Sequence, residues 1–440
     1  MALTLVIASL SILGMVALLI WKPSIKVGPI KLSTFYWPPL LGALLLLIFQ
    51  NGLSDAFVAN LISDAPTNPV KLLTLFFSMS FLSLALDEAG LFSYLASKAI
   101  AYGKDQMSLF VLIYFVTGLL TVFTSNDIVV LTFTPFILSF CKRAKISPLP
   151  FLMEEFVAAN TFSMALLIGN PTNIYLSESV GFGFFKYLEV LLLPTTLAAG
   201  VSFLMLFLLF RKSLSAPLEA HAEVEPLKDK VATIVGVVNL GICILLLSIS
   251  SFIQVEMHLI CFLFCAAEFL FLLFYCVSKD IKEEDHPYSL LINSVKRVPY
   301  ALIPFLLSMF TIVDALSLSG VNAAVAGALA NLPPIYGVGV ASFLSCSLMN
   351  NIPMSVLFAD LIPAVGGNYV ANYYAAVIGS NLGALLTPLG ALAGIMWMNM
   401  LDGKGCHISF ARFTKCGLAI SLISLLFALS GLQLSLLIFQ

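Results

Sequence analysis

The sequence predicts an all-α polytopic membrane protein built from two similar halves. Hydrophobic residues make up 60% of the 440-residue chain and charged residues only 10%, and the mean hydropathy is +1.05. Apolar runs recur along the whole chain without a long polar block, and a transmembrane helix needs about 20 such residues. One apolar run in each half is interrupted near its middle by asparagines. These observations predict about ten spans and two re-entrant hairpins.

The candidate membrane elements begin at the N-terminus. The first run lacks a basic segment and a small-residue cleavage site, so we expect a span there rather than a signal peptide. The runs 108–141 and 336–364 contain the asparagine breaks and are the expected hairpins. We expect short interfacial helices at 88–105 and 403–414. The remaining runs are 2–20, 39–50, 71–86, 151–180, 187–210, 231–252, 257–277, 299–318, 371–401 and 415–438.

Basic residues favour hairpins over pairs of full spans at these two runs, because cytoplasmic loops collect Lys and Arg. With two hairpins and an outside N-terminus, every Lys and Arg except Lys71 and Lys186 falls on the cytoplasmic side. Each half then has an odd number of spans, which makes the halves inverted repeats. The predicted division is a first repeat with a cytoplasm-side hairpin, a cytoplasmic linker, and a second repeat with an outside hairpin. These are residues 1–210, 211–230 and 231–440, respectively.

The composition argues against several other classes of protein. The polar stretches 211–230 and 278–299 are shorter than the roughly 50 residues that a soluble domain needs. The chain has no HExxH, GxSxG or phosphate-binding loop motif, and its cysteines form no CxxC pair. We therefore expect no enzyme activity, no cofactor and no structural metal. The net charge of −2 gives no reason to expect nucleic acid as a partner.

Four polar breaks predict a binding site inside the membrane. Hydrocarbon cannot hydrogen-bond freed backbone groups, so such breaks occur where protein or a cavity surrounds them, and matched breaks in two repeats indicate a transporter's site. The alternative is a set of proline kinks used for packing. The breaks lie at 124–127, 169–173, 349–353 and 380–390. The candidate binding residues are Ser125, Asn126, Asp127, Asn170, Thr172, Asn173, Asn350, Asn351, Ser380, Asn381 and Thr387.

Asp127 is the sharpest single candidate because it lies at the first hairpin tip. Intramembrane carboxylates are costly and usually functional, so we expect Asp127 to couple transport to a proton or a cation. Its alternative role is a cap on a helix N-terminus. Glu154 and Glu155 are expected at the cytoplasmic interface. Glu268 stands alone at mid-span, and the sequence assigns it no partner.

Four segments carry recognisable motifs in a fixed order: LDEAGLF (86–92), SNDIVVLTFTPF (125–136), SLMNNIP (347–353) and GSNLGALLTPLGALAGIMWM (379–398). They resemble the ion transporter superfamily, in particular its arsenite-permease and NhaD-type sodium/proton antiporter branch, which is related to sodium-coupled anion permeases. The resemblance covers nearly the whole chain and implies scaffold spans around a mobile core, elevator-like movement and a homodimer. The break GNPTN at 169–173 is closer to the antiporters and anion permeases.

The function expected from these features is proton-coupled export of arsenite, antimonite or a related small inorganic solute across the inner (plasma) membrane. The negative charge of Asp127 suits a neutral trihydroxy-arsenic molecule, a proton or a sodium ion better than a dicarboxylate. Sodium/proton antiport and sodium-coupled uptake of a carboxylate or oxyanion are the alternatives. The expected partners are the solute, its coupling ion, the lipid bilayer and a second copy of the chain. Arsenite pumps can also recruit a separate cytoplasmic ATPase subunit.

Overall fold

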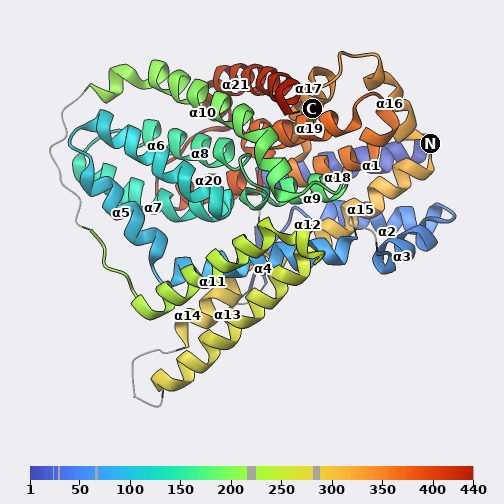
Figure 1. Ribbon diagram of the computed structural model, residues 1–440. Helices are drawn as coiled ribbons and strands as arrows, with labels where there is room; N and C mark the ends of the chain where they lie inside the picture. The colour runs from blue at the N-terminus through green and yellow to red at the C-terminus, as the bar shows by residue number, and fades with distance from the viewer. Residues whose placement is uncertain (23, 28–29, 65–67, 216–223, 281–287, 440) are drawn as a thin grey trace.

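The computed structural model describes the whole chain except residues 23, 28–29, 65–67, 216–223, 281–287 and 440 (Figure 1). The first half contains α1 (Ala2–Trp21), β1 (Ser24–Val27), β2 (Ile30–Ser33), α2 (Trp37–Phe49), α3 (Leu53–Ile62), α4 (Pro69–Glu88), α5 (Leu91–Tyr102), α6 (Gln106–Phe123), α7 (Asn126–Ala144), α8 (Leu149–Phe162), η1 (Leu167–Gly169), α9 (Pro171–Glu178) and α10 (Phe184–Leu214).

The second half repeats much of this order, from α11 to α21. Its elements are α11 (Lys230–Ser248), α12 (Ser250–Ile253), α13 (Met257–Asp280), α14 (Ser289–Arg297), α15 (Leu302–Leu318), α16 (Val321–Ala330), α17 (Tyr336–Met349), α18 (Asn351–Val365), α19 (Tyr369–Leu382), η2 (Gly383–Leu385), η3 (Pro388–Gly390), α20 (Leu392–Gly403) and α21 (Phe410–Phe439).

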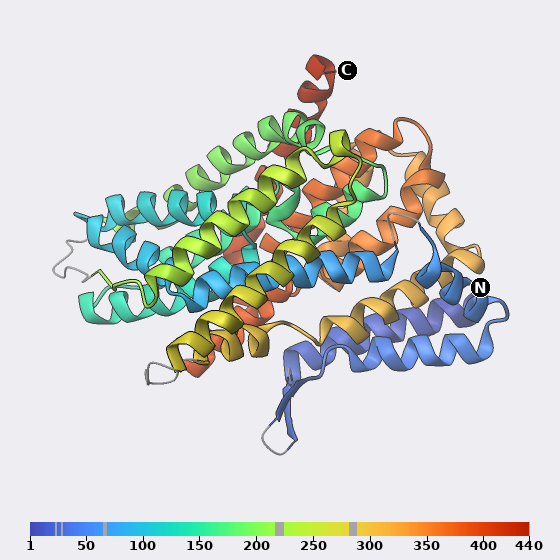
Figure 2. The same ribbon diagram turned by 60° about the horizontal axis from the view of Figure 1, so that its bottom comes forward.

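The all-α membrane architecture predicted from composition is confirmed. Among the described helices, seven are long and apolar enough to cross a membrane, and the pair α2–α3, bent by 117°, makes an eighth candidate span. The expected spans at 151–180 and 371–401 are broken helices, and the first expected span is α1. The short antiparallel pair β1–β2 was not predicted; it projects from the helices in Figure 2.

One boundary prediction is wrong. Residues 403–414 form no helix of their own, because α20 ends at Gly403 and α21 begins at Phe410. The expected linker 211–230 starts inside α10, which continues to Leu214, and its residues 216–223 lie outside the described part. The interfacial helix expected at 88–105 corresponds to α5, and its counterpart in the second half is the unpredicted α16.

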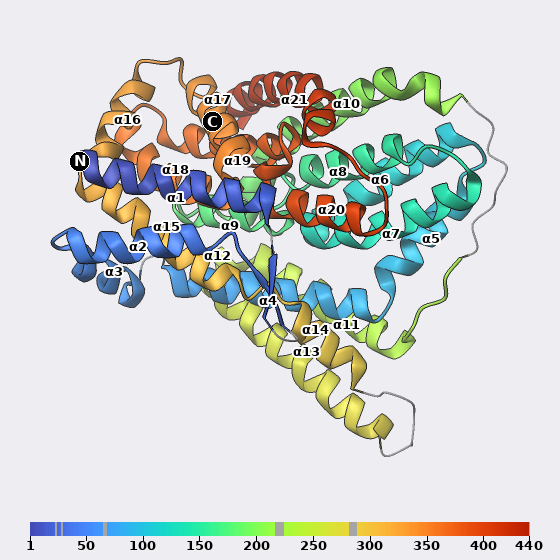
Figure 3. The same ribbon diagram turned by 180° about the vertical axis from the view of Figure 1, so that it is seen from behind.

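On the outside of the molecule, helices of each half pack against a helix of the other half. The pair α1 and α2 packs against α15 from the second half, while α11 and α13 pack against α4 from the first half. Figures 2 and 3 show these two groups on the outside of the remaining helices. The long helices α10 and α21, which end the two halves, pack extensively against each other. This exchange joins the two halves into one body.

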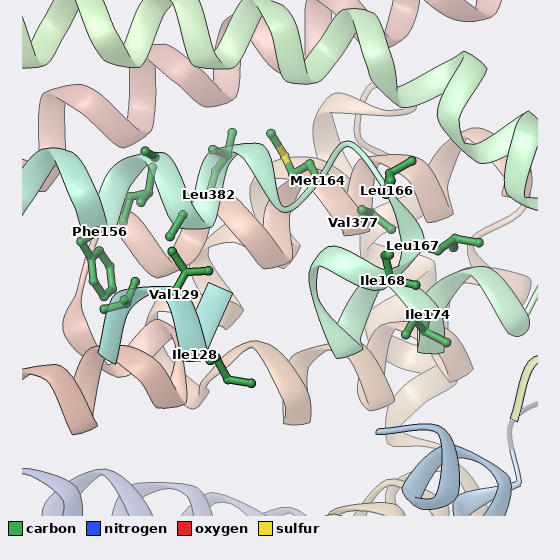
Figure 4. Packing of buried hydrophobic residues seen from close by; sticks show 14 of the residues in the cluster. Ile128, Val129, Phe156, Met164, Leu166, Leu167, Ile168, Ile174, Val377 and Leu382 are labelled. Atoms are coloured by element: carbon green, nitrogen blue, oxygen red, sulfur yellow. The ribbon is translucent and has the colours of Figure 1, made fainter. Parts of the chain in front are cut away.

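The interior contains the two hairpins and the two broken helices. The first hairpin is α6–α7 with its break at Ser125, and the second is α17–α18 with its break at Asn350. Apolar side chains fill the space between α7, α8 and α19, where Val129, Phe156 and Leu382 are fully buried (Figure 4). A separate apolar cluster joins α1, α2 and α15. The polar breaks are therefore held in the interior, surrounded by protein.

Candidate functional site

The first hairpin tip is the turn between α6 and α7. The backbone is extended at Ser125, and α7 starts at Asn126. Nδ2 of Asn126 donates to Oδ1 of Asn160 on α8 at 3.0 Å, while the buried Oδ1 of Asn126 has no hydrogen-bond partner within the described part. The Asp127 carboxylate lies close to the backbone amide of Ala393, in the first turn of α20. The positive ends of two helix dipoles therefore meet at one carboxylate.

The second hairpin tip is tied to the second broken helix. Asn350 has φ +84° and ψ 153°, a strained conformation that is almost restricted to glycine, and its Oδ1 accepts from the Ile352 amide at 3.3 Å to cap α18. Its Nδ2 donates to the Leu389 carbonyl at 3.0 Å. The neighbouring Asn351 is buried, and its Oδ1 lacks a partner among the residues described. Each tip thus holds one buried, unpartnered asparagine oxygen.

The two broken helices are joined by a buried network centred on Asn381. Its Oδ1 accepts from Ser163 Oγ at 2.7 Å and Asn170 Nδ2 at 2.9 Å, and its Nδ2 donates to Asn173 Oδ1 at 2.7 Å. Thr172 Oγ1 extends the network, at 3.0 Å from Asn170 Oδ1 and 3.2 Å from Ser380 Oγ.

The network residues are buried. Each of them is at most 2% exposed. In this conformation, the amides of Asn170, Asn173 and Asn381 satisfy one another across the two halves.

The second break also contacts the second hairpin. Thr387 donates its hydroxyl to the Ser347 carbonyl at 2.6 Å, and Ser347 Oγ donates to the Gly383 carbonyl at 3.0 Å. A Cβ on Gly383 would lie 2.6 Å from the Phe343 carbonyl oxygen, so α17 can approach this closely only because residue 383 is a glycine. The hairpin and the broken helix are therefore held together by backbone contacts as well as side chains.

Two adjoining cavities form a narrow crevice from one tip to the other, which we call the tip crevice. One, of about 20 Å³, is lined by Thr124 and Ser125; the other, of about 40 Å³, reaches Thr172, Ile352 and Ser355. Both share lining residues of α4 and α9, and α15 closes part of the second. A water molecule needs roughly 10–15 Å³ of such space. The tip crevice therefore has room for only one or a few water-sized groups.

The predicted site residues divide into three groups by their positions. Ser125 and Thr172 line the tip crevice. Asp127 lies beside α20 and is not among the crevice-lining residues. The others form the hairpin tips or the network between the broken helices. These are Asn126, Asn350 and Asn351 at the tips, with Asn170, Asn173, Ser380, Asn381 and Thr387 around the breaks.

Sequence reasoning missed residues that support the site from α8. Asn160 holds the first tip, and Ser163 contacts the central Asn381. The polar run Asn-Thr-Phe-Ser at 160–163, just before the first break, is the signal that could have found them. Glu154 and Glu155 were expected at the cytoplasmic interface, but both are 0% exposed inside the protein. Within the described part, no group of three or more His, Cys, Asp or Glu side chains could hold a metal ion.

Glu268, which had no assigned partner, contacts a polar residue on a neighbouring helix. Its Oε2 accepts from Nδ2 of Asn239 on α11 at 2.9 Å, and its side chain is almost completely buried. Gly236 on α11 allows this helix to approach α4 closely, because a Cβ there would lie 2.8 Å from Leu86. Glu268 therefore belongs to the packing of α11 and α13, away from the tip crevice.

Comparison with known proteins agrees with this architecture. Residues 3–374 match the citrate transporter family model. The arsenical pump membrane protein of Escherichia coli is 27% identical, with 96% of each chain aligned, and the 46 kDa membrane protein of Mycobacterium leprae is 26% identical over 83% of this chain and 85% of its own.

A solved structure shares the fold. The YdaH transporter of Alcanivorax borkumensis, whose topology is described as unusual, matches with a TM-score of 0.57 at 16% identity, covering 98% of this chain and 97% of its own. The bacterial relatives and the apolar helices agree on a multi-pass protein of the inner membrane. Together, these findings describe a secondary transporter of anions. The chain belongs to the citrate transporter family, within the arsenite-permease and NhaD-type branch that its motifs resemble.

Proposed function

We propose that this transporter exports arsenite, antimonite or a related small inorganic solute in exchange for protons. The observation that carries the proposal is the tip crevice, which is small, mainly apolar, and includes a few residues with hydroxyl groups. Ser80, Ser83, Thr124, Ser125, Thr172 and Ser355 contribute these hydroxyls. The relatives named arsenical pump membrane proteins, aligned over 96% of this chain, support the choice of solute.

Charge and size both argue against a large anion in the tip crevice. A tricarboxylate buried there would need cationic partners, since buried charges are costly unless they are paired. The described lining residues include no Lys, Arg or His. Pockets for drug-sized ligands usually measure roughly 300–1,000 Å³, whereas the larger part of the crevice is about 40 Å³. A small neutral trihydroxy molecule matches hydroxyl groups that both donate and accept hydrogen bonds.

Helix N-termini supply the remaining polarity of the proposed site. The tip crevice is bordered by Ser125 before α7, Pro171 at the start of α9, and Ile352 at the start of α18. The partial positive charge at a helix N-terminus attracts electronegative atoms even where, as at α9 and α18, an asparagine already caps the first amides. We therefore assign Ser125 and Thr172 to direct contact with the solute. The unpartnered oxygens of Asn126 and Asn351 are acceptors available when the tips rearrange.

Asp127 is the proposed coupling carboxylate. Charge-assisted hydrogen bonds are roughly twice as strong as neutral ones. Binding of a proton to Asp127 would therefore weaken its contact with the Ala393 amide and loosen the first hairpin from α20. This gives a physical link between proton binding and movement of a tip that borders the tip crevice. The amides of Asn170, Asn173, Asn350 and Asn381, with the hydroxyls of Ser380 and Thr387, hold the breaks around it.

The proposed movement is an elevator-type displacement of the core against the outer helices. The two repeats, 1–210 and 231–440, would each contribute a hairpin and a broken helix to the moving core. The exchange of α1–α2 and α11–α13 between halves supports a separate outer scaffold. A homodimer through scaffold helices and an associated cytoplasmic ATPase subunit are further parts of the proposal that the family resemblance suggests.

Proton flux in proteoliposomes of the purified protein tests the proposal. An internal pH dye is read while arsenite, sodium or an anion such as citrate is added singly and in pairs. We expect arsenite alone to drive proton movement, and we expect Asp127→Asn to abolish it while the protein stays folded. Asp360→Asn is the matched control, because Asp360 lies on the second hairpin but is exposed to solvent.

The same assay separates the alternative functions. A response to sodium alone would identify a sodium/proton antiporter, and a response that needs both sodium and an anion would identify a sodium-coupled permease. Arsenite-driven proton flux that survives Asp127→Asn would contradict the assigned role of this carboxylate.

A further inference from the structure

The contact between α7 and α8 contains polar groups that the proposed function does not use. The two helices are joined by the short segment 145–148 and pack against each other. Asn126 and Asn160 meet at 3.0 Å at the tip end, and Thr134 lies 3.1 Å from both carboxylate oxygens of Glu155 further along. Glu154 adjoins Glu155 in the chain, so two acids lie side by side inside the core.

The Thr134 hydroxyl is the one side-chain partner of Glu155 among the described residues. It lies 3.1 Å from both carboxylate oxygens of Glu155 and 2.7 Å from the Val130 carbonyl. A hydroxyl has one proton, so Thr134 fully satisfies at most one of these acceptors. A buried charge is costly unless it is paired, so proton binding to Glu155 would relieve this cost.

Glu154 is fully buried, and neither of its carboxylate oxygens has a hydrogen-bond partner among the described residues. No ion pair in that part of the chain joins either acid to a Lys, Arg or His. Tyr114 on α6 and Cys141 on α7 are titratable groups near Glu154, and both are uncharged in their ordinary states. Buried polar groups are normally hydrogen-bonded, so two buried acids, one of them without a described partner, call for a functional explanation.

A cavity lies at one end of the α7–α8 contact. It has a volume of about 580 Å³ and lies between α7, the start of α8 and the segment after α20, where Ser139, Lys142, Pro148 and Cys406 line it. Neither acid lines this cavity, but Pro135, which follows Thr134 in the chain, does. Thr134 contacts Glu155, so this acid is held next to the cavity wall, while the hairpin tip lies at the other end of α7.

We propose that Glu154 and Glu155 form a proton-binding site inside the core, which exchanges protons through the cavity at Lys142 and adds to the coupling provided by Asp127. This rests on the proposed proton-coupled transport. Proton binding and release at the acids would alter the contact between α7 and α8. Because α7 starts at the first tip, that change would reach the tip crevice.

Transport by Glu154→Gln and Glu155→Gln variants tests this role, since glutamine keeps the size and hydrogen-bonding capacity of the side chain. Solute exchange between two equal pools requires no net proton movement, whereas net export does. We expect exchange to be retained, while the protons moved per solute decrease and the pH dependence of export flattens. Glu268→Gln is the matched control, because Glu268 is also buried but lies in the outer helices. An unchanged proton ratio and pH profile in both variants would overturn the proposal.

Infrared difference spectra of the purified protein, recorded between acid and alkaline pH, provide a measurement that does not need transport. We expect the wild type to show carbonyl bands of titrating buried carboxylic acids, and the double variant to lose the part of this signal that Glu154 and Glu155 contribute, while Asp127 still contributes. A signal that persists undiminished in the double variant would refute the proton site. If the wild type transports no arsenite, the proposed function fails, while the spectra still decide this inference.

Discussion

Replacing Asn381 by alanine removes the central amide of the buried network that joins the two broken helices. Asn170 Nδ2 and Asn173 Oδ1 each have Asn381 as their one side-chain partner among the contacts described, so both would be left buried without a hydrogen bond. Ser163 keeps its bond to the Asn160 carbonyl at 2.9 Å. Each orphaned buried group costs about 1–3 kcal/mol. The two together predict a loss of about 2–6 kcal/mol in the free energy of unfolding.

Thermal unfolding in detergent, followed with a thiol-reactive dye, measures this loss. The dye reports unfolding because Cys141, Cys243, Cys261 and Cys346 are buried in the folded protein. Asn331→Ala is the control, since Asn331 is exposed at the end of α16 and such changes usually cost at most about 0.5 kcal/mol. An Asn381→Ala protein that melts with the control but no longer transports would refute this reasoning. It would show that Asn381 mainly binds the solute.

Three further predictions concern the tips and the outer helices. Asp127→Asn should abolish proton-coupled flux with little change in melting temperature, as measured in proteoliposomes and by thermal unfolding. Asn350→Ala should destabilise the protein by about 1–2 kcal/mol, because it removes the α18 cap and places a Cβ without a local hydrogen bond at positive φ. Asn350→Gly should cost less, because glycine adopts positive φ without strain. Equal melting temperatures of the two variants would contradict this prediction. Arg297→Gln should lower the melting temperature, because Arg297 lies 2.7 Å from the buried Asp87, and the simultaneous change Asp87→Asn should restore part of the loss.

Much of the fold could be predicted because its signals are local. Proline at 171 cannot donate a backbone hydrogen bond, and Asn170 caps the helix that follows, so the break is encoded within a few residues. Asn350 does the same at the second tip. The apolar runs fixed the approximate helices for a similar reason, since hydrophobicity over about 20 residues is a property of the segment alone. The unpredicted α16 is shorter and lacks this signal.

The candidate site was only partly predictable because its contacts cross the chain. Asn170 and Asn381 are more than two hundred residues apart, and nothing near either residue indicates that they bind each other. Glu154 and Glu155 precede a break and follow a loop, a position that suits an interface as well as a core. Only packing by α6, α7, α10 and α19 around α8 decides that they are buried.

The sequence alone determined that this protein is a helical membrane transporter with two hairpins and two broken helices. The length of an apolar run and the effects of proline and asparagine on a helix are properties of short segments. The tertiary structure decided which polar groups satisfy one another and which remain without partners. It assigned Asn381 to a closed network and left Glu154 with no partner among the described residues. A hydrogen bond between distant segments depends on how helices pack, and this packing is set by many weak apolar contacts together.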